Sequence, residues 1–177
     1  MKKKPTFPEP NCRTDCQHFK AVGSMLNETC YCMKAGRKNG RRFRRKDLKR
    51  KPPEWCPLRL NPPVCRIYGF KDDFQEMMER RVWLSIDPKK QDLCYPSLYR
   101  YQFRREIPLG MSAAQFYAAV KEEPVEDVLG DALLKPGELI EIDNGLSSQF
   151  FYYYNSMTVI PAKMIGFEKP GKAGCHD

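Results

Sequence analysis

The cysteines of this sequence are gathered near its beginning. Five of the eight fall between Cys12 and Cys56, Cys65 follows closely, and Cys94 and Cys175 stand apart. The basic residues that open the chain are followed by no apolar stretch, so we expect no secretory signal and a cytoplasmic protein. In that reducing compartment, clustered cysteines more often hold a metal ion than form disulfides. The clustering therefore predicts a local metal site.

Zinc suits these side chains best, because it prefers thiolate sulfur and imidazole nitrogen in a tetrahedral arrangement. Cys12 and Cys16 are spaced C-x3-C, a C-x-C pair follows, and Cys56 lies in a Pro/Trp turn that can close the site. The candidate ligands of Zn2+ are Cys12, Cys16, Cys30, Cys32 and Cys56. The preferred set is Cys12, Cys16, Cys56 and one of Cys30 and Cys32, with His18 and the remaining thiol beside the metal.

Two other interpretations of the cysteines stay open. They can be buried free thiols that act as small hydrophobic side chains. Alternatively, Cys30 and Cys32 can form a redox pair, although C-x-C is not the usual spacing of disulfide oxidoreductases. A second zinc site that uses Cys65, Cys94 or the Cys175-His176 pair has weaker support from the spacing.

The early cysteines, the Cys-Tyr-Cys between them and the closing Pro-Pro-Glu-Trp-Cys-Pro-Leu carry a resemblance. Residues 12–60 look like short zinc-binding proteins from phages and mobile elements of Gram-positive bacteria. The resemblance implies that Cys56 is a zinc ligand. The chain departs from the usual pattern by its C-x3-C spacing and by a long basic insertion before Pro-Pro-Glu-Trp. Because mobile elements carry defence inhibitors as well as regulators, the resemblance implies a setting rather than an activity.

Charge divides the chain in the same place as the cysteines. Residues 1–66 have a formal balance of +13 and residues 67–177 a balance of −4, which together give the net charge of +9. A joint at Asn61-Pro62-Pro63 precedes the change. We therefore expect a basic zinc-binding module over residues 1–66 and a separate body over residues 67–177. Such asymmetry bears on partners more than on fold.

A dense basic run lies inside the expected module. Ten of the fifteen positions from Arg37 to Lys51 are Lys or Arg, and such a cluster binds DNA or RNA through its phosphates. Phe43, within the run, is placed to stack on a base. The alternatives are a solvated loop, an acidic protein surface or membrane headgroups. The candidate nucleic-acid-binding residues are Arg37, Lys38, Arg41, Arg42, Phe43, Arg44, Arg45, Lys46, Lys49, Arg50 and Lys51.

The body mixes helix and strand patterns, which predicts an α+β fold with an antiparallel sheet. The firmest element is a helix after Ser112, because Ser112 and Gln115 match a capping box. Further helices are expected over 72–84 and 124–134. Strands are expected across 99–103, 139–142, 150–154 and 157–160.

Aromatic residues dominate the stretch from Phe150 to Tyr154. Phe150, Tyr152 and Tyr154 would share one face of a strand. This pattern favours a central strand of the sheet, and the alternative is an exposed surface that binds a protein partner. The eight acidic residues between Glu122 and Asp143 favour a solvated helix face over a cation site.

The sequence contains no pattern typical of a catalytic site. It has two histidines, no Gly-rich phosphate loop and no G-x-S-x-G motif, so we expect no enzymatic activity. No run of eighteen apolar residues predicts a membrane span. The leading hypothesis is a zinc-binding, nucleic-acid-binding accessory protein of a phage or mobile element. The alternative is a protein-directed inhibitor of a host nucleic-acid enzyme, such as an anti-CRISPR protein acting on a CRISPR effector nuclease.

Overall fold

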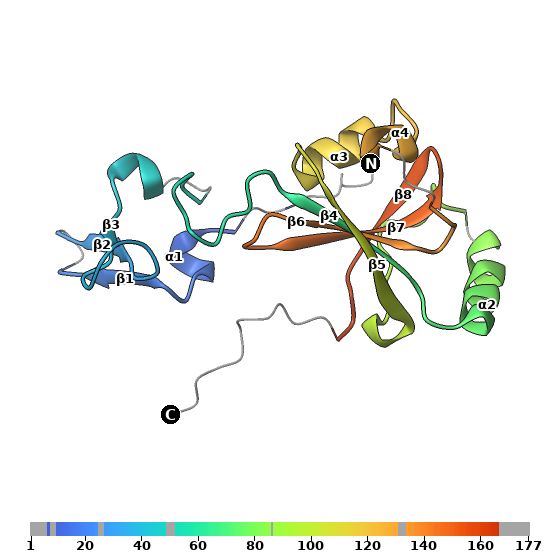
Figure 1. Ribbon diagram of the computed structural model, residues 1–177, viewed down its shortest axis with the longest axis horizontal. Coiled ribbons are helices and arrows are strands. Elements are labelled where there is room, and N and C mark those ends of the chain that lie inside the picture. Colours follow the sequence, from blue (N-terminus) through green and yellow to red (C-terminus); the bar gives the residue numbers. More distant parts are fainter. Residues whose placement is uncertain are drawn as a thin grey trace. The chain divides into compact units, whose positions relative to one another are not determined.

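The computed structural model in Figure 1 divides the chain into two compact units, and it describes residues 7, 10–24, 27–48, 52–85, 87–130 and 134–166. The smaller unit, here called the module, comprises Pro8–Arg59 and Gly145–Ser147. The larger unit, here called the body, comprises Met1–Phe7, Leu60–Asn144 and Ser148–Asp177. The division at residues 59/60 precedes the expected boundary at 66/67, because Val64 already begins a strand of the body.

The module is built around a three-stranded antiparallel sheet in the order β1-β2-β3. Its small core contains the buried side chains of Cys30, Cys32, Ala35 and Phe43. The sequence patterns did not predict this sheet, because its strands are short and half exposed. The elements are α1 (Cys12–Asp15), β1 (Phe19–Val22), β2 (Thr29–Cys32), β3 (Arg41–Arg42) and the 3-10 helix η1 (Arg45–Leu48).

The body contains a five-stranded antiparallel sheet in the order β5-β4-β6-β7-β8. Its strands are β4 (Val64–Phe70), β5 (Tyr101–Pro108), β6 (Leu139–Asp143), β7 (Ser148–Asn155) and β8 (Thr158–Ala162). Its helices are α2 (Asp73–Leu84), η2 (Leu98–Arg100), α3 (Ala113–Ala119) and α4 (Val125–Leu129). These elements confirm the expected α+β class with an antiparallel sheet.

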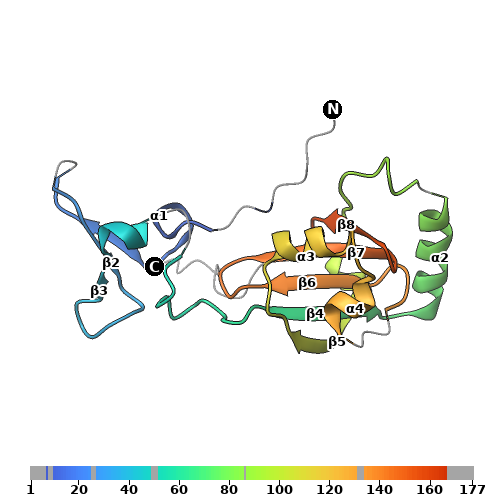
Figure 2. The same ribbon diagram turned by 90° about the horizontal axis from the view of Figure 1, so that it is seen from above.

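Apolar side chains cover both faces of the body's sheet. On one face, side chains such as Ile67, Ile140 and Phe151 pack with Phe116 of α3 and Val125 of α4. Figures 1 and 2 show both helices lying over this face. On the other face, residues of β6 and β7 pack with Cys94, which precedes η2, with Leu98 of η2 and with Met164, which follows β8. The sheet is therefore the centre of two cores.

Local sequence signals explain the helices of the body. The Ser112 hydroxyl accepts a hydrogen bond from the backbone of Gln115, and the Gln115 side chain accepts one from the backbone of Ser112 at 2.9 Å. This capping box is the one that the sequence predicts. The expected helix over 124–134 ends at Leu129, because Gly130 takes a φ of 64° that stops it. Residues 131–133 lie outside the described part.

The expected strand across 99–103 begins at Tyr101, and Tyr99 belongs to the 3-10 helix η2 instead. Strand β4 was not expected at all, although it is the strand that pairs with both β5 and β6. Among the described residues, no helix is long and apolar enough to cross a membrane.

Candidate metal centre and basic surface

The first two cysteines of the module are fixed by a short capped helix. Cys12 begins α1 and Cys16 follows its last residue, so the two thiols are about one helical turn apart. The Asn11 side chain accepts a hydrogen bond from the backbone of Arg13 at 2.9 Å, and the backbone of Asn11 donates to the Asp15 carboxylate at 2.7 Å. These two bonds hold the turn that separates the cysteines.

The hairpin of β1 and β2 brings the third cysteine to the same place. Phe19 is the register partner of Cys32, and the backbone of Met33 donates to the carbonyl of His18 at 2.8 Å. Cys16 precedes β1 and Cys32 ends β2, so both lie at the open end of the hairpin. Cys30 is two residues before Cys32 in β2, and its register partner is Ala21. Because side chains on one face of a strand recur every second residue, Cys30 and Cys32 lie on the same face of β2.

A tight turn positions the fourth cysteine. The backbone of Cys56 donates to the carbonyl of Pro53 at 2.9 Å, and its own carbonyl accepts from Arg59 at 3.1 Å. The backbone N–H groups of Leu58 and Arg59 also point toward the Cys56 sulfur and lower its pKa, although burial raises that pKa overall. Donors aimed at a sulfur favour its thiolate form, which is the form that binds metals.

Four thiols are near enough to influence one another's ionisation. Burial, together with the charges of Cys56, Cys16 and Cys32, raises the pKa of Cys12 to about 12. The pKa of Cys56 is likewise raised by burial and by the charges of Cys32 and Cys16. A cation among these groups would remove their mutual repulsion, because it binds all of them as thiolates. The chemistry of this set therefore fits zinc.

The four thiols are neighbours but do not enclose a metal ion as they lie. Within the described part of the chain, no group of three or more His, Cys, Asp or Glu side chains has the arrangement of a metal site.

Cys30 stands apart from this set of thiols. Its sulfur lies 3.8 Å from a carboxylate oxygen of Glu28, which also forms an ion pair with Arg13. After burial, the charge of Glu28 is the main cause that raises the pKa of Cys30, and no other cysteine contributes. Cys30 and Cys32 share the module's small core, but only Cys32 acts on the ionisation of Cys12 and Cys56, so we prefer Cys32 as the fourth candidate ligand.

The remaining cysteines of the body do not extend the set. Cys65 and Cys94 belong to the cores on opposite faces of the sheet, and burial raises the pKa of each to about 12. Such buried thiols behave as small hydrophobic side chains. Cys175 and His176 lie outside the described residues. The structure thus gives no support to a second zinc site at Cys65 or Cys94.

The basic run forms the outer surface of the module. Gly40, which closes the turn between β2 and β3, has a φ of 70°, and a Cβ there would meet the carbonyl oxygen of Cys32 at 2.8 Å. Beyond this turn, both residues of β3 are exposed. Lys49, Arg50 and Lys51 lie outside the described residues. The described basic side chains of the run are all exposed, namely Arg37, Lys38, Arg41, Arg42, Arg44, Arg45 and Lys46.

Phe43 does not have the role that the sequence predicts. Its side chain is only 6% exposed, and its ring packs against Phe19 and Trp55 with centroid distances of 5.6 and 5.2 Å. The backbone of Phe43 donates to the carbonyl of Cys30 at 2.9 Å, which turns the side chain inward. The residue therefore anchors the basic run to the module's core instead of stacking on a base. Arg41 lies over the other side of this cluster, 4.3 Å from the Trp55 ring.

The aromatic stretch of the body is a central strand, as the sequence favours. Strand β7 lies between β6 and β8, and Phe150 and Tyr152 are 7% and 1% exposed. Tyr154 is half-buried against the same core. The alternative, in which Phe150, Tyr152 and Tyr154 form an exposed partner-binding surface, is therefore wrong in this structure. Two neighbouring strands and the segment around η2 cover these rings.

Several acidic residues that the sequence assigned to a solvated helix face are buried in the sheet. Glu138, Glu141 and Asp143 are 3%, 1% and 5% exposed. Glu138 precedes β6 and forms an ion pair with Arg104, while Glu141 and Asp143 lie within β6. The expectation of a solvated face is wrong for these three residues, because their basic and hydroxyl partners come from distant strands.

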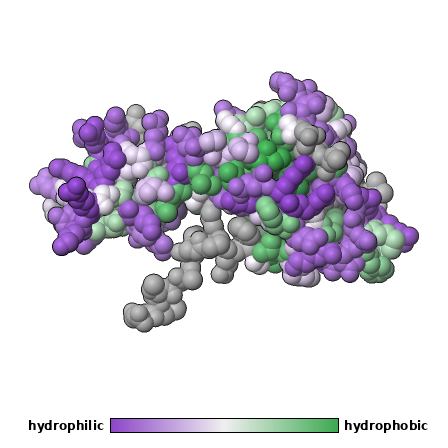
Figure 3. All heavy atoms as spheres, in the orientation of Figure 1, coloured by the Kyte–Doolittle hydropathy of each residue, from purple (hydrophilic) through white to green (hydrophobic). Residues whose placement is uncertain are grey.

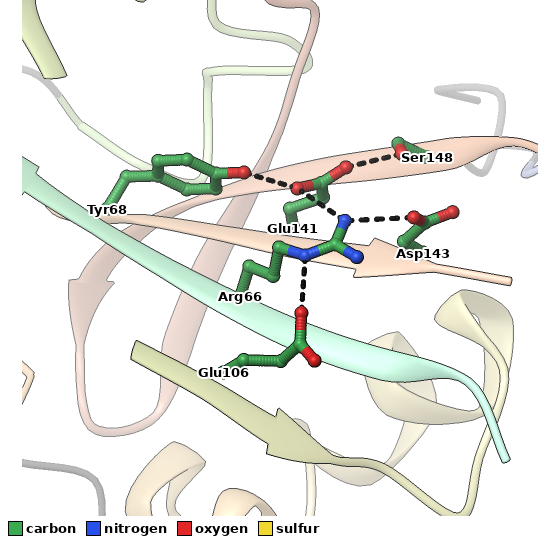
Figure 4. Close-up of polar contacts among 6 residues, drawn as sticks. All are labelled: Arg66, Tyr68, Glu106, Glu141, Asp143 and Ser148. Carbon is green, nitrogen blue, oxygen red and sulfur yellow. Dashed lines mark hydrogen bonds and ion pairs between the residues drawn. The ribbon is translucent and has the colours of Figure 1, made fainter. Parts of the chain in front are cut away.

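Figure 4 shows the network around Glu141. Arg66 is the register partner of both Glu106 and Glu141, so the three lie in one row across β5, β4 and β6. The Arg66 guanidinium donates to Glu106 at 2.6 Å and to Asp143 at 2.8 Å, and it lies 3.4 Å from Glu141. These bonds raise the pKa of Arg66, although burial alone would lower it.

Both oxygens of the Glu141 carboxylate have hydrogen-bond donors. Tyr68 donates to one oxygen at 2.6 Å and Ser148 donates to the other. Burial and these bonds to Glu141 raise the pKa of the Tyr68 hydroxyl, which keeps it a donor. A fully bonded carboxylate is typical of a structural network. We therefore interpret Glu141 as part of the bonding that holds β4, β6 and β7 together.

No known protein family, curated protein or solved structure matches this chain.

Proposed function

We propose that the module is a zinc-ordered element that binds the phosphate backbone of DNA or RNA. The observation that carries this proposal is the exposure of every described basic side chain between Arg37 and Lys46 on one short segment. In the space-filling view of Figure 3, the visible surface of the module is largely hydrophilic. A dense set of exposed cations releases condensed counterions when it contacts phosphates.

The zinc ion would be held by Cys12, Cys16, Cys32 and Cys56. When bound, it would supply a fixed positive centre for four thiolates, and it would do no chemistry on a substrate. Support for this role comes from the convergence of the four thiols and from the N–H groups that point at Cys56. Cys32 and Cys56 lie on either side of the basic run in the sequence, so their joint ligation limits the ordering cost when the run meets nucleic acid.

The exposed basic side chains favour binding to phosphates without recognition of a particular base sequence. The one aromatic ring within the run, Phe43, is buried and so is withdrawn from base stacking. Arg41 is engaged with Trp55, which leaves the side chains on either side of it as the free phosphate contacts. Phosphate contacts position a protein and base contacts give specificity. This role is compatible with the setting implied by the resemblance of residues 12–60 to short zinc-binding proteins of phages and mobile elements.

The test is binding of the zinc-loaded protein to short duplex DNA, single-stranded DNA and RNA over a salt series. The variant is Arg44→Gln with Arg45→Gln, since both side chains are exposed and neither belongs to the module's core. The control is Lys71→Gln with Lys163→Gln, which removes the same charge from exposed positions of the body.

The module variant should lower affinity about tenfold or more at low salt and reduce the slope of log K against log salt by about 2. The control should change both quantities far less. Weak binding by the unmodified protein to all three nucleic acids contradicts the proposal. Equal losses in the variant and the control contradict it as well, because net charge alone would then explain the binding.

A further inference from the structure

The two faces of the module's sheet present different side chains. Directly opposed residues of antiparallel strands point to the same face, and successive residues of one strand point to opposite faces. Phe19, Cys32 and Arg41 are opposed in one row, and Cys30 lies on the same face two residues before Cys32. Cys30, Cys32 and Phe19 belong to the module's core. One face of the sheet therefore covers this core, and the opposite face points away from it.

The outer face has a tyrosine between two basic residues. Lys20 of β1, Tyr31 of β2 and Arg42 of β3 are register partners, so they form one row across the sheet, here called the outer row. Lys20 and Arg42 are exposed, and Tyr31 is half-buried. Neighbouring strands are about 4.8 Å apart, so a basic side chain begins close to the ring on each side. The outer row thus combines an aromatic ring with two positive charges.

Tyr31 is the aromatic ring of the module that its core does not use. The rings of Phe19 and Trp55 both pack on Phe43, with centroid distances of 5.6 and 5.2 Å. Among the described residues of the module, Tyr31 lies outside this cluster, because its place in β2 turns it to the other face. A ring on the outer face of a sheet is available to a planar ligand.

The charge of the outer face favours an anionic ligand. The described strands β1, β2 and β3 contain no Asp or Glu. The acidic residue nearest to Tyr31 in the sequence, Glu28, is directed to the core side. Its carboxylate lies 3.8 Å from the Cys30 sulfur and forms an ion pair with Arg13. A ligand on the outer row would therefore meet positive charge and an aromatic surface together.

We propose that the outer row is a subsite for one unpaired base of single-stranded DNA or RNA. The Tyr31 ring stacks on the base, and Lys20 and Arg42 contact the phosphates on either side of it. Aromatic rings beside basic groups on a sheet are a known platform for the bases of single strands. In a duplex each base is stacked between its neighbours, so a ring on a sheet does not reach its face unless the base is extruded.

This inference rests on the proposed binding of nucleic acid and narrows its substrate to single strands. It also agrees with binding that does not recognise a particular sequence, because every base has a face on which an aromatic ring can stack. The basic run would supply the phosphate contacts that a duplex and a single strand share. Tyr31 would supply the contact that only an unpaired base can make.

The experiment is a binding titration of the zinc-loaded full chain over a salt series, with three labelled probes. They are a single DNA strand of mixed sequence, a strand of equal length whose sites are abasic, and the matching duplex. The unmodified protein should bind the base-containing strand at least about fivefold more tightly than the abasic strand, because stacking on one base contributes this much. At high salt, it should also bind that strand more tightly than the duplex.

The variant is Tyr31→Leu, and its matched control is Tyr31→Phe. Tyr31→Leu should lower affinity for the base-containing strand about fivefold or more, whereas Tyr31→Phe keeps the ring and should stay within about twofold. Neither should change affinity for the abasic strand, which reports on the phosphate contacts and on whether the module is folded. The salt slope should also stay the same in Tyr31→Leu, since no phosphate contact is removed.

The basic residues of the outer row are tested by Lys20→Gln with Arg42→Gln. This double variant should reduce the slope of log K against log salt by about 1.4 on the single strand, because it removes two phosphate contacts. It should do so on the base-containing and the abasic strand alike. An unchanged slope would overturn the part of the inference that concerns Lys20 and Arg42.

Several results would overturn the inference and leave the proposed function standing. They are equal affinity of the unmodified protein for the base-containing and abasic strands, tighter binding of the duplex at every salt concentration, and unchanged binding in Tyr31→Leu. Binding of poly-glutamate that Tyr31→Leu weakens equally would overturn it too, since the partner would then be an acidic peptide. Absence of binding to all three nucleic acids is a different result, because it contradicts the proposed function itself.

Discussion

Thirteen buried side chains pack between the body's sheet and its helices α3 and α4, and seven more cover the other face of the sheet. Among the described residues, the core cluster of the module has four buried side chains, and two of these are cysteines. Both units contain an antiparallel sheet, so topology does not separate them. The difference is how much apolar surface each can bury, because a unit as small as the module rarely gains enough from its core alone.

The comparison teaches that cysteine has two different roles in this chain. In the body, Cys65 and Cys94 are isolated in apolar surroundings and fill space. In the module, burial and the charges of neighbouring cysteines, Cys32 among them, raise the pKa values of Cys12 and Cys56. Neighbouring thiols of this kind would gain stability from a cation that binds them as thiolates. The body can be stable by packing, whereas we expect the module to depend on the zinc ion proposed for it.

The largest expected effect is loss of the module without loss of the body. Cys56→Ser should remove one zinc ligand and unfold the module, because structural zinc contributes roughly 10 kcal/mol or more in small domains. In amide NMR spectra, the signals of β2 should collapse while those of β6 persist. Cys30→Ser is the matched control, since Cys30 lies outside the set of four thiols. Equal behaviour of the two variants would remove the distinction between Cys30 and the other cysteines.

The converse experiment weakens the body. Phe151→Ala removes a fully buried ring at the centre of the larger core and should lower the free energy of unfolding of the body by about 3–5 kcal/mol. Zinc content, measured by mass spectrometry of the native protein, should stay the same. If zinc were lost together with the body's stability, the two units would not be independent.

The dependence on pH should have opposite signs with and without metal. In the metal-free module, the pKa of Cys12 is raised from 9.0 to about 12, so the folded form favours the protonated thiol. That contribution to stability is present below pH 9 and is lost as the pH rises from 9 toward 12. With zinc bound, the thiols are thiolates, so stability should fall as the pH decreases. Thermal unfolding of the metal-free and zinc-bound forms, followed from pH 5 to about 11, would measure both pH dependences. The same sign in both forms would contradict ligation by thiolates.

The smallest expected effect concerns Phe43. Because its ring is packed against Phe19 and Trp55, Phe43→Leu should cost about 1 kcal/mol of module stability and leave nucleic-acid affinity within about twofold. A titration of the zinc-loaded variant with single-stranded DNA measures this. A loss of tenfold or more would mean that the ring leaves the core and stacks on bases.

Local signals were enough to predict part of the fold. Ser112 and Gln115 predict the start of α3 because a capping box involves residues that are three apart. The aromatic run predicts β7 because strands favour such side chains. Three of the four grouped cysteines were also preferred from spacing and from the turn at Cys56.

The remaining features depend on residues that are far apart in the sequence. Choosing Cys32 over Cys30 requires knowing which side chains of the fold lie near each cysteine, which spacing does not contain. The burial of Glu141 depends on Arg66 and Tyr68, which are more than seventy residues away. The sequence predicts base stacking for Phe43 because its neighbours along the chain are basic. In the fold, its ring packs instead with Phe19 and Trp55.

The approach of Cys32 to Cys56 has a consequence for how this protein can change over generations. The chain between them leaves and returns to nearly the same point, so residues can be inserted or deleted there without moving either end. Doubling the length of such a loop costs only about 0.6 kcal/mol in closure entropy. Selection can therefore adjust the number of arginines and lysines in this loop, except at β3 and Phe43, which belong to the module's sheet and core.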